Sequence, residues 1–305
     1  MLRSYLIITL AMLFFSGNFI AGKAFEGTIS PVTLAFFRAF MGALILIPLS
    51  WKTIVQNIPL WKREWRPLFG LAVTGIILFN ISLYWAVALT STINAAIVDA
   101  LTPAVAGVMG FILLKERLHP IQNAGIILSF SGILWIISEG SIEVLVNLDF
   151  NVGDIIMFAG IICWALYSII IKQHSYKFPP VAGLAVTMIL GAVIMFPFAL
   201  LEGSILGFPA LNNWAVIGGL FYIGIFPSAI ALLLWYRGVG EIGPSKASVF
   251  FNLVPVFTTA LAVTLLGEEF TYHQLFGGIV VLLGVYISTK RPIKNHPSMH
   301  KEDLQ

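Results

Sequence analysis

The run PVAGLAVTMILGAVIMFPFALL at residues 180–201 holds 22 consecutive residues without a charged side chain. A helix rises about 1.5 Å per residue, so this run is long enough to cross the roughly 30 Å of hydrocarbon in a bilayer. Similar runs follow one another along almost the whole chain. They predict transmembrane helices near residues 5–22, 31–50, 67–89, 93–114, 121–138, 153–172, 180–201, 213–236, 246–266 and 272–289.

The composition excludes a water-soluble fold. Of the 305 residues, 59% are hydrophobic and only 10% are charged, and the mean hydropathy is +0.95. Soluble domains carry roughly a quarter charged residues. The runs are also too long and too uniformly apolar for the strand alternation of an outer-membrane barrel. We therefore predict an all-α integral membrane protein of ten transmembrane helices, with the lipid bilayer as its surroundings.

Charge and cysteine content exclude further classes. The net charge of +3 is spread over termini and loops and forms no basic patch, so no nucleic-acid partner is expected. The single cysteine, Cys163, lies within an apolar run, which rules out an intramolecular disulfide. No cluster of residues has metal-ligand spacing, and no nucleotide or dinucleotide motif is present. We expect neither a metal nor a cofactor.

The basic residues predict the orientation of the chain. With a cytoplasmic N-terminus, fifteen of the 17 Lys and Arg residues fall in cytoplasmic loops or tails. Lys23 alone falls in an external loop, and Arg38 lies within a helix. This bias follows the positive-inside rule. We therefore predict a multi-pass protein of the cell (inner) membrane with both termini in the cytoplasm.

The chain also repeats itself. Pairs at a shift of 149 residues include Lys23 with Lys172, Pro31 with Pro180 and Gly75 with Gly224; pairs at 152 include Pro103 with Pro255, Glu116 with Glu268 and Gly132 with Gly284. Because each unit holds five helices, the second must enter the membrane in the opposite orientation, as in many secondary transporters. We predict a first five-helix repeat at 1–140, an external linker at 141–152, a second five-helix repeat at 153–290 and a disordered cytoplasmic tail at 291–305.

These features resemble the drug/metabolite transporter superfamily, specifically its EamA-type members with two repeats. The resemblance rests on Ser16-Gly17-Asn18-Phe19, Ser30-Pro31, Phe37-Arg38, Leu101-Thr102-Pro103, Leu114-Lys115-Glu116-Arg117-Leu118, Leu253-Val254-Pro255 and Leu266-Gly267-Glu268-Glu269. It covers about residues 5–290 and implies a ten-helix, basket-like carrier that exports amino acids or other small metabolites without ATP. The chain departs from the family pattern where Phe15-Ser16-Gly17 replaces Trp-Gly in the first helix, whereas the second half keeps Trp164.

Two ionisable residues, Arg38 and Asp99, lie deep within predicted helices. A charge inside hydrocarbon costs at least about 2.5 kcal/mol on insertion scales, so each requires an explanation. Both lie about 10–12 Å from the predicted outer surface, close enough in depth to meet. One interpretation is a structural ion pair that holds two helices together. The other is contact with substrate or a proton, and snorkelling or misplaced helix ends are a third possibility.

Other candidates for substrate binding or coupling surround this pair. Thr102 follows Asp99 by three residues and shares its helical face, and Trp164 and Tyr167 have the spacing to stack on an organic substrate. Packing or hydrogen bonding between helices is the alternative for each of them. The full set of candidates is Asp99, Arg38, Asn18, Asn80, Tyr84, Thr102, Trp164, Tyr167 and Asn252.

Several repeat-related residues have structural interpretations. Glu116 and Glu268 each follow a long helix and are expected to cap or orient the tight turn into the next helix. Pro103 and Pro255 lie within helices and are expected to kink them. The seven-residue spacing of Gly125 and Gly132, and of Gly277 and Gly284, predicts close-packing surfaces within the fold or between protomers of a possible homodimer.

The sequence favours transport over catalysis. All five histidines fall in loops or the tail, and no nucleophile, base or cofactor loop is visible. We predict that the chain is not an enzyme but a secondary transporter that exports amino acids or similar small polar metabolites by alternating access, coupled to a proton gradient. The alternative is uptake or exchange of a sugar, a nucleotide or a drug-like compound. Phosphate-bearing substrates are disfavoured because only Arg38 offers a deep cation.

Overall fold

The computed structural model describes residues 2–114, 120–141, 143, 151–207, 209, 213–242 and 249–289. Within these ranges the chain is almost entirely helical and holds no β-strand, which confirms the predicted all-α fold. The predicted tail at 291–305 and Glu116 lie outside the described residues. So does the predicted linker at 141–152, apart from residues 141, 143, 151 and 152.

The predicted segments match helices in the same order along the chain. In order they are α1 (Leu2–Ala24), α2 (Pro31–Gln56), α4, η1 and α5 (Trp65–Leu71, Ala72–Leu78, Phe79–Leu89), α6 and α7 (Thr92–Asp99, Thr102–Leu114), α8 (Pro120–Ile137), α10 (Val152–His174), α11 (Pro180–Leu206), α12, η3 and α13 (Trp214–Ile223, Gly224–Ile230, Ala231–Ile242), η4, α15 and η5 (Val249–Asn252, Leu253–Leu261, Ala262–Leu266) and α16 (Tyr272–Thr289). Two short segments, α3 (Ile58–Arg63) and η2 (Ser175–Lys177), were not predicted as helices.

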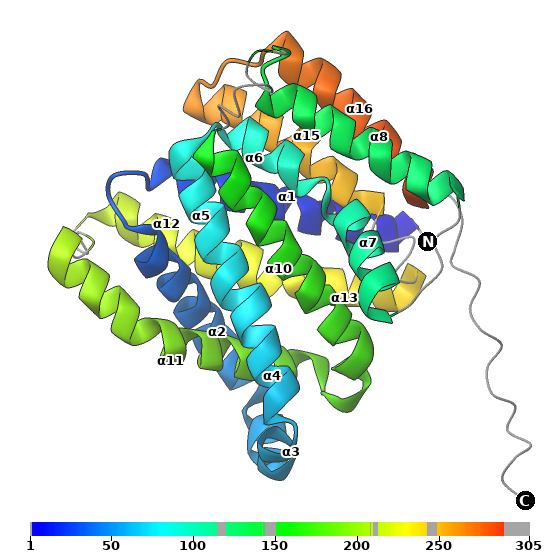
Figure 1. Ribbon diagram of the computed structural model, residues 1–305. Helices are drawn as coiled ribbons and strands as arrows, with labels where there is room; N and C mark the ends of the chain where they lie inside the picture. The colour runs from blue at the N-terminus through cyan, green and yellow to red at the C-terminus, as the bar shows by residue number, and fades with distance from the viewer. Residues whose placement is uncertain are drawn as a thin grey trace, which may run out of the picture.

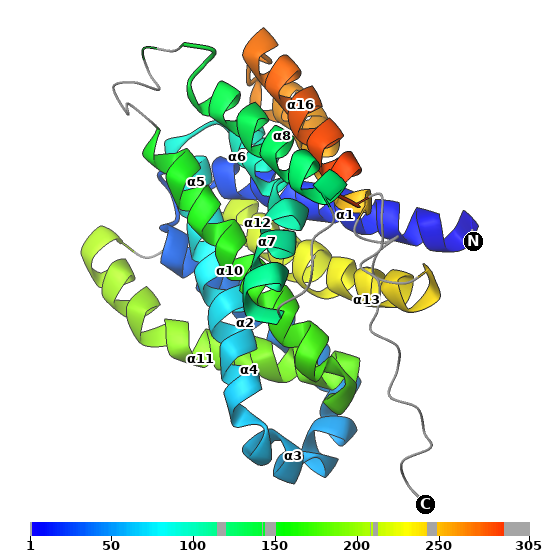
Figure 2. The same cartoon turned by 45° about the vertical axis from the view of Figure 1, so that its right-hand side comes forward.

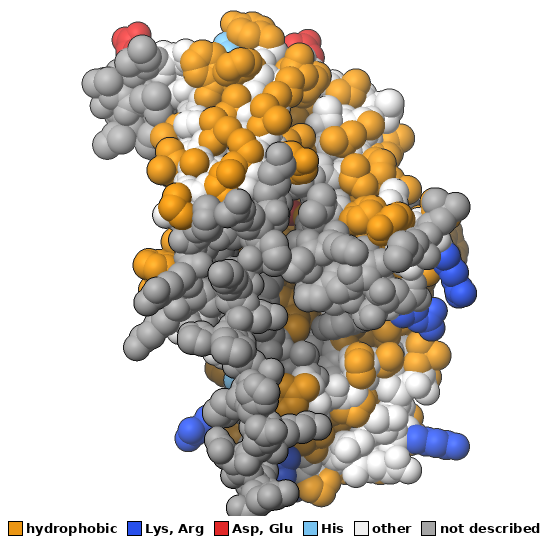
Figure 3. Space-filling model, turned by 90° about the vertical axis from the view of Figure 1, so that its right-hand side faces the viewer, with side chains coloured by type: hydrophobic (Ala, Val, Ile, Leu, Met, Phe, Trp, Pro, Cys, Tyr) orange, Lys and Arg blue, Asp and Glu red, His pale blue; other side chains and the backbone are white. Residues whose placement is uncertain are grey.

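Length and composition suit these helices to a bilayer. Within the described ranges seven helices are long and apolar enough to cross a membrane, and three shorter apolar helices supply the remaining predicted segments. Large apolar side chains such as Ile127 and Leu265 lie exposed on their outer faces, where lipid but not water would solvate them. Figure 3 shows hydrophobic side chains over much of one face, with Lys and Arg side chains in its lower half.

The two halves of the chain interleave. Helix α1 packs against α13 and α15 of the second half, and its counterpart α10 packs against α5 and α7 of the first half. Equivalent helices also meet in pairs, α2 with α11 and α8 with α16. Figures 1 and 2 show α8 and α16 side by side at one edge of the bundle, away from α2 and α11. Both halves therefore contribute walls to one shared interior.

Glycines allow α8 and α16 to approach closely. A Cβ atom added at Gly284 would lie 2.6 Å from the carbonyl oxygen of Gly125, and one added at Gly132 would lie 2.9 Å from that of Gly277. Both distances are shorter than side-chain carbons tolerate against a backbone that cannot move aside. The predicted glycine surfaces therefore pack against each other within the fold.

Two π-helical segments mark the repeat. η1 begins at residue 72 and ends at 78, and η3 begins at 224 and ends at 230, so their bounds differ by 152 residues. In each half a side chain bonds a carbonyl five residues before it: Asn80 Nδ2 donates to the Gly75 oxygen at 3.0 Å, and Ser228 Oγ donates to the Ile223 oxygen at 2.8 Å. A π-helical turn therefore recurs in the corresponding segment of each half.

Candidate functional site

Arg38 enters the interior from α2, seven residues after the helix begins. Its side chain is buried, with 8% of the residue exposed. The Nε atom donates to Ser228 Oγ at 2.9 Å, a bond that joins the two halves of the chain, while the buried Nη1 atom has no hydrogen-bond partner among the described residues. The guanidinium is thus oriented from one side and keeps unused donors on the other.

Asp99 lies where the predicted helix 93–114 divides into α6 and α7. Pro103 explains the division, because it has no N–H to donate to the Asp99 carbonyl and its ring crowds that carbonyl. The turn is closed instead by the Leu101 N–H, which donates to the Val98 oxygen at 3.0 Å. The predicted kink therefore interrupts the regular α-helical bonding here, and Asp99 is the last residue of α6. Thr102 Oγ1 donates to Asp99 Oδ1 at 3.3 Å.

Arg38 and Asp99 line the same cavity, which has a volume of about 30 Å³. Asn18 and Trp164 also line it, and Phe15, Phe79 and Phe251 supply apolar wall. The described residues include no ion pair between Arg38 and Asp99, so the structural pairing considered from the sequence is not formed in this conformation. Residues of opposite charge therefore line one small cavity without forming an ion pair.

A second cavity, of about 10 Å³, adjoins the first through Arg38 and Trp164, which line both. The predicted aromatic pair meets here, with the Trp164 and Tyr167 ring centroids 5.0 Å apart. Gly75 makes room for Tyr167, because a Cβ at Gly75 would overlap the tyrosine ring. Asn80 lines this cavity as well, and its buried Oδ1 has no hydrogen-bond partner among the described residues.

Two tyrosines link the residues of these central cavities to larger cavities nearby. Tyr84 Oη donates to Asn18 Oδ1 at 2.8 Å, and Tyr84 also lines a cavity of about 340 Å³ at the end of the molecule where α1 ends and α2 begins. Tyr167 separates the smaller central cavity from another of about 50 Å³ lined by Leu68, Phe178 and Pro180. The two central cavities have room for only a few water molecules, whereas ligand pockets measure roughly 300–1,000 Å³. In this conformation they are too small to hold such a ligand.

Six of the nine predicted site residues line the two central cavities: Asp99, Arg38, Asn18, Asn80, Trp164 and Tyr167. Tyr84 and Thr102 do not line them, but they bond Asn18 and Asp99, which do. Asn252 also lies outside their lining; it ends η4, and its buried Oδ1 has no partner among the described residues. Ser228, which holds Arg38, was missed. Its only signal in the sequence is a hydroxyl beside Pro227 in an apolar run.

Comparison with known proteins identifies the family. The EamA-like transporter family is matched over residues 2–138 and again over 151–290. The chain belongs to the EamA-like transporter family. The "Uncharacterized transporter YyaM" of Bacillus subtilis is 31% identical over 93% of this chain and 92% of its own length, and an "Uncharacterized transporter" of Archaeoglobus fulgidus is 28% identical over 95% and 98%. A solved crystal structure shares the fold, with a TM-score of 0.63 at 18% identity over 94% of this chain and 96% of that chain.

Carboxylates from the second repeat of this EamA-like transporter cap helices of the first. Glu202 accepts from the Thr33 N–H at 2.8 Å and from Thr33 Oγ1 at 2.9 Å, near the start of α2. Glu268 accepts from the N–H groups of Thr92 and Ile93 at 3.0 and 3.3 Å, at the start of α6. A negative charge at a helix N-terminus is favourable. Glu268 thus holds the turn before α16 against the start of α6, and its carboxylate caps a helix of the other repeat instead of its own next helix.

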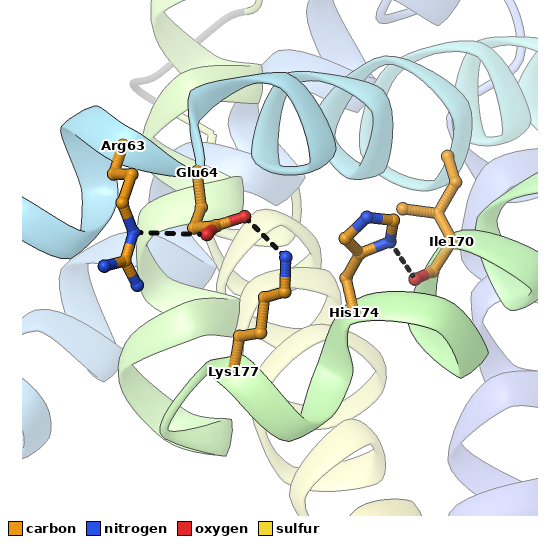
Figure 4. Close-up of polar contacts among 5 residues, drawn as sticks. All are labelled: Arg63, Glu64, Ile170, His174 and Lys177. Atoms are coloured by element: carbon orange, nitrogen blue, oxygen red, sulfur yellow. Dashed lines mark hydrogen bonds and ion pairs between the residues drawn. The ribbon is translucent and has the colours of Figure 1, made fainter.

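At the opposite end of the EamA-like transporter, Glu64 lies between two basic side chains (Figure 4). Lys177 Nζ lies 2.8 Å from Glu64 Oε2, and Arg63 Nε lies 3.3 Å from Glu64 Oε1. The hydrogen bond from Lys177 lowers the pKa of the Glu64 carboxyl from its usual value. This contact joins the residue before α4, in the first repeat, to η2, which connects α10 and α11 in the second repeat.

Proposed function

We propose that this EamA-like transporter exports amino acids or similar small polar metabolites by alternating access, driven by a proton gradient. The observation that carries the proposal is that two residues of opposite charge, Arg38 and Asp99, line one small cavity, with Tyr84 bonded to its Asn18 and Tyr167 lining the adjoining cavity. Charges this deep in a membrane protein are costly and are found along substrate and ion pathways. A polar substrate reaches them when Tyr84 or Tyr167 moves aside.

Asp99 is our candidate for proton coupling. Its only hydrogen bond from a described side chain is the 3.3 Å contact with Thr102, and it is the only acid among the described residues that line the two central cavities. Carboxylates in such positions serve as proton relays in pumps and transporters. Protonation and deprotonation of Asp99 would then accompany the change between outward-open and inward-open states.

We further infer that the two repeats enter the membrane in opposite orientations, with both termini in the cytoplasm and the protein in the cell membrane. Support comes from the two separate matches to the family and from the bias of the basic residues. A homodimer stays a prediction. That the chain is not an enzyme is supported by relatives that are named transporters.

Transport by purified protein in proteoliposomes tests this function. Vesicles loaded with an unlabelled amino acid mixture should exchange it for labelled amino acids without ATP. An acidic lumen should drive accumulation, because protons leaving the vesicle carry the opposite flux inward. Asp99→Asn should exchange substrate at saturating concentration but fail to accumulate it. Accumulation that requires ATP, or an Asp99→Leu protein that accumulates substrate like the parent, contradicts the proposal.

A further inference from the structure

We propose that the substrate is a zwitterion bound in one fixed orientation, with its carboxylate on Arg38 and its ammonium group on Asp99. This inference rests on the proposed function and assigns to each charge of the site a recognition role. The two cavity charges are of opposite sign, line one cavity and do not pair with each other. A ligand that carries both complementary charges satisfies both at once.

The anionic end of the ligand is assigned to Arg38. Ser228 accepts from Nε, so the Nε edge of the guanidinium is already engaged. The other terminus, which contains the unpartnered Nη1, is free to donate in parallel to two oxygens of a carboxylate. The bond to Ser228 also fixes the plane of the guanidinium before the ligand arrives, which lowers the entropy lost on binding.

The cationic end is assigned to Asp99. An ionised carboxylate accepts about four hydrogen bonds, and the described side chains supply one, the 3.3 Å bond from Thr102. Helix α6 ends at Asp99, and the C-terminal end of a helix carries partial negative charge that favours a nearby cation. An ammonium group with three N–H donors fits both features.

The rest of the wall determines what kind of molecule carries these charges. Among the described residues that line the two central cavities, Arg38 is the only cation and Asp99 the only anion. One charge of each sign fits a ligand of zero net charge and disfavours phosphate esters and polyamines. Trp164, Phe79 and Phe251 offer apolar surface for an uncharged side chain between them.

Binding by matched compounds tests the assignment. The first set is leucine, 4-methylpentanoate, which lacks the amino group, and 3-methylbutylamine, which lacks the carboxylate; the second is phenylalanine, 3-phenylpropanoate and 2-phenylethylamine. Binding is read as the rise in unfolding temperature of the full-length protein in detergent. For at least one of the two amino acids, we expect the concentration that half-saturates the wild-type protein to be at least tenfold lower than that of the matching acid and that of the matching amine. This comparison requires no variant, so it stands whether or not substituted proteins fold.

Single substitutions then separate the two ends. Asp99→Asn should weaken amino acid binding about tenfold, so that the variant binds the amino acid and the acid with equal affinity. Arg38→Gln should bind the amino acid and the amine with equal affinity. Asp99→Glu and Arg38→Lys, which keep the charges, should retain the preference for the zwitterion. Wild-type protein that binds an acid or an amine as tightly as the amino acid overturns the proposal, as does stabilisation by none of the six compounds.

Transport distinguishes this failure from failure of the proposed function. If the proteoliposomes exchange a compound that lacks one of the two charges as well as they exchange amino acids, the protein is a carrier and the zwitterion assignment is wrong. If they exchange no compound without ATP, the proposed function itself fails.

Discussion

The guanidinium of Arg38 is held by a hydroxyl from the other half of the chain, Ser228, at 2.9 Å. Ser228→Ala removes the acceptor and leaves a buried charged donor unpaired, so the free energy of unfolding should fall by about 1–3 kcal/mol. Ser228→Thr keeps the hydroxyl and should stay close to the parent. Denaturant unfolding of the three proteins in one detergent measures this, and an alanine variant as stable as the parent would contradict the role of Ser228 as the partner of Arg38.

Glu64 makes stability depend on pH. Because the bond from Lys177 lowers its pKa in the folded state, Glu64 stabilises the fold above its unfolded-state pKa, and this contribution is lost as the pH falls through the folded-state pKa. Glu64→Gln should therefore lower the unfolding temperature at pH 7. The difference from the parent should shrink steadily in a series down to about pH 3.

Lys177→Gln is the matched control for this effect. It removes the donor that lowers the pKa of Glu64, so it should abolish most of the pH-dependent difference between Glu64 and its glutamine variant. A difference that grows toward acid pH would show that ionised Glu64 destabilises the fold, which is the opposite of the predicted effect.

Single residues were predictable where they break a pattern. Arg38 and Asp99 stand out because a charged side chain within an apolar run is costly in a membrane and is usually functional or paired. Ser228 does not stand out, because hydroxyls are common in membrane helices and their partner is set by tertiary packing. The absence of an Arg38–Asp99 ion pair was likewise beyond the sequence, since spacing gives depth in the membrane but not the distance between side chains on different helices.

At the scale of elements, the contact between α8 and α16 depends on glycine. A Cβ at position 284 would lie 2.6 Å from the Gly125 oxygen and 2.5 Å from the Ser129 nitrogen, both of them backbone atoms. Gly284→Ala should destabilise the protein by about 1–3 kcal/mol, the cost of overpacking. Gly218→Ala on α12 is the control, because a Cβ there meets no atom within 4 Å, and its effect should stay within about 0.5 kcal/mol. Equal loss of stability in both variants would show that the glycine contact is not what holds the two helices together.

Helix positions followed closely from apolar runs and their punctuation. The predicted run 180–201 lies within α11, which continues to Leu206, and the run 31–50 lies within α2, which continues to Gln56. The boundaries differ because helices extend past the hydrocarbon-length stretch until a capping residue stops them. Pro103 predicted a kink, but whether a proline bends or breaks a helix depends on packing around the freed carbonyl. The π-helical segments had no sequence signal.

At the scale of the molecule, two ends are closed by different chemistry. Where α1 ends and α2 begins, Glu202 of the second repeat bonds Thr33 of the first and Tyr84 bonds Asn18, and Glu268 of the second repeat caps the start of α6. At the other end the ion pair of Glu64 and Lys177 is partly exposed to solvent, which weakens such pairs. Opening either end therefore means breaking contacts between the repeats. The repeat itself was visible in the sequence, but these contacts were not, because their partners have no fixed sequence spacing.

Alternating access predicts that one residue in the central cavity can be reached from both sides of the membrane. Phe251 lines the cavity that holds Arg38 and Asp99, and Cys163 is the sole native cysteine. The test is labelling of Phe251→Cys, in a Cys163→Ser background, by a membrane-impermeant thiol reagent applied to one face at a time. Ile161→Cys, at a fully buried packing position, is the control that should label from neither face. Alternating access predicts labelling of position 251 from each face, slowed by substrate; labelling from one face only, or from neither, would contradict it.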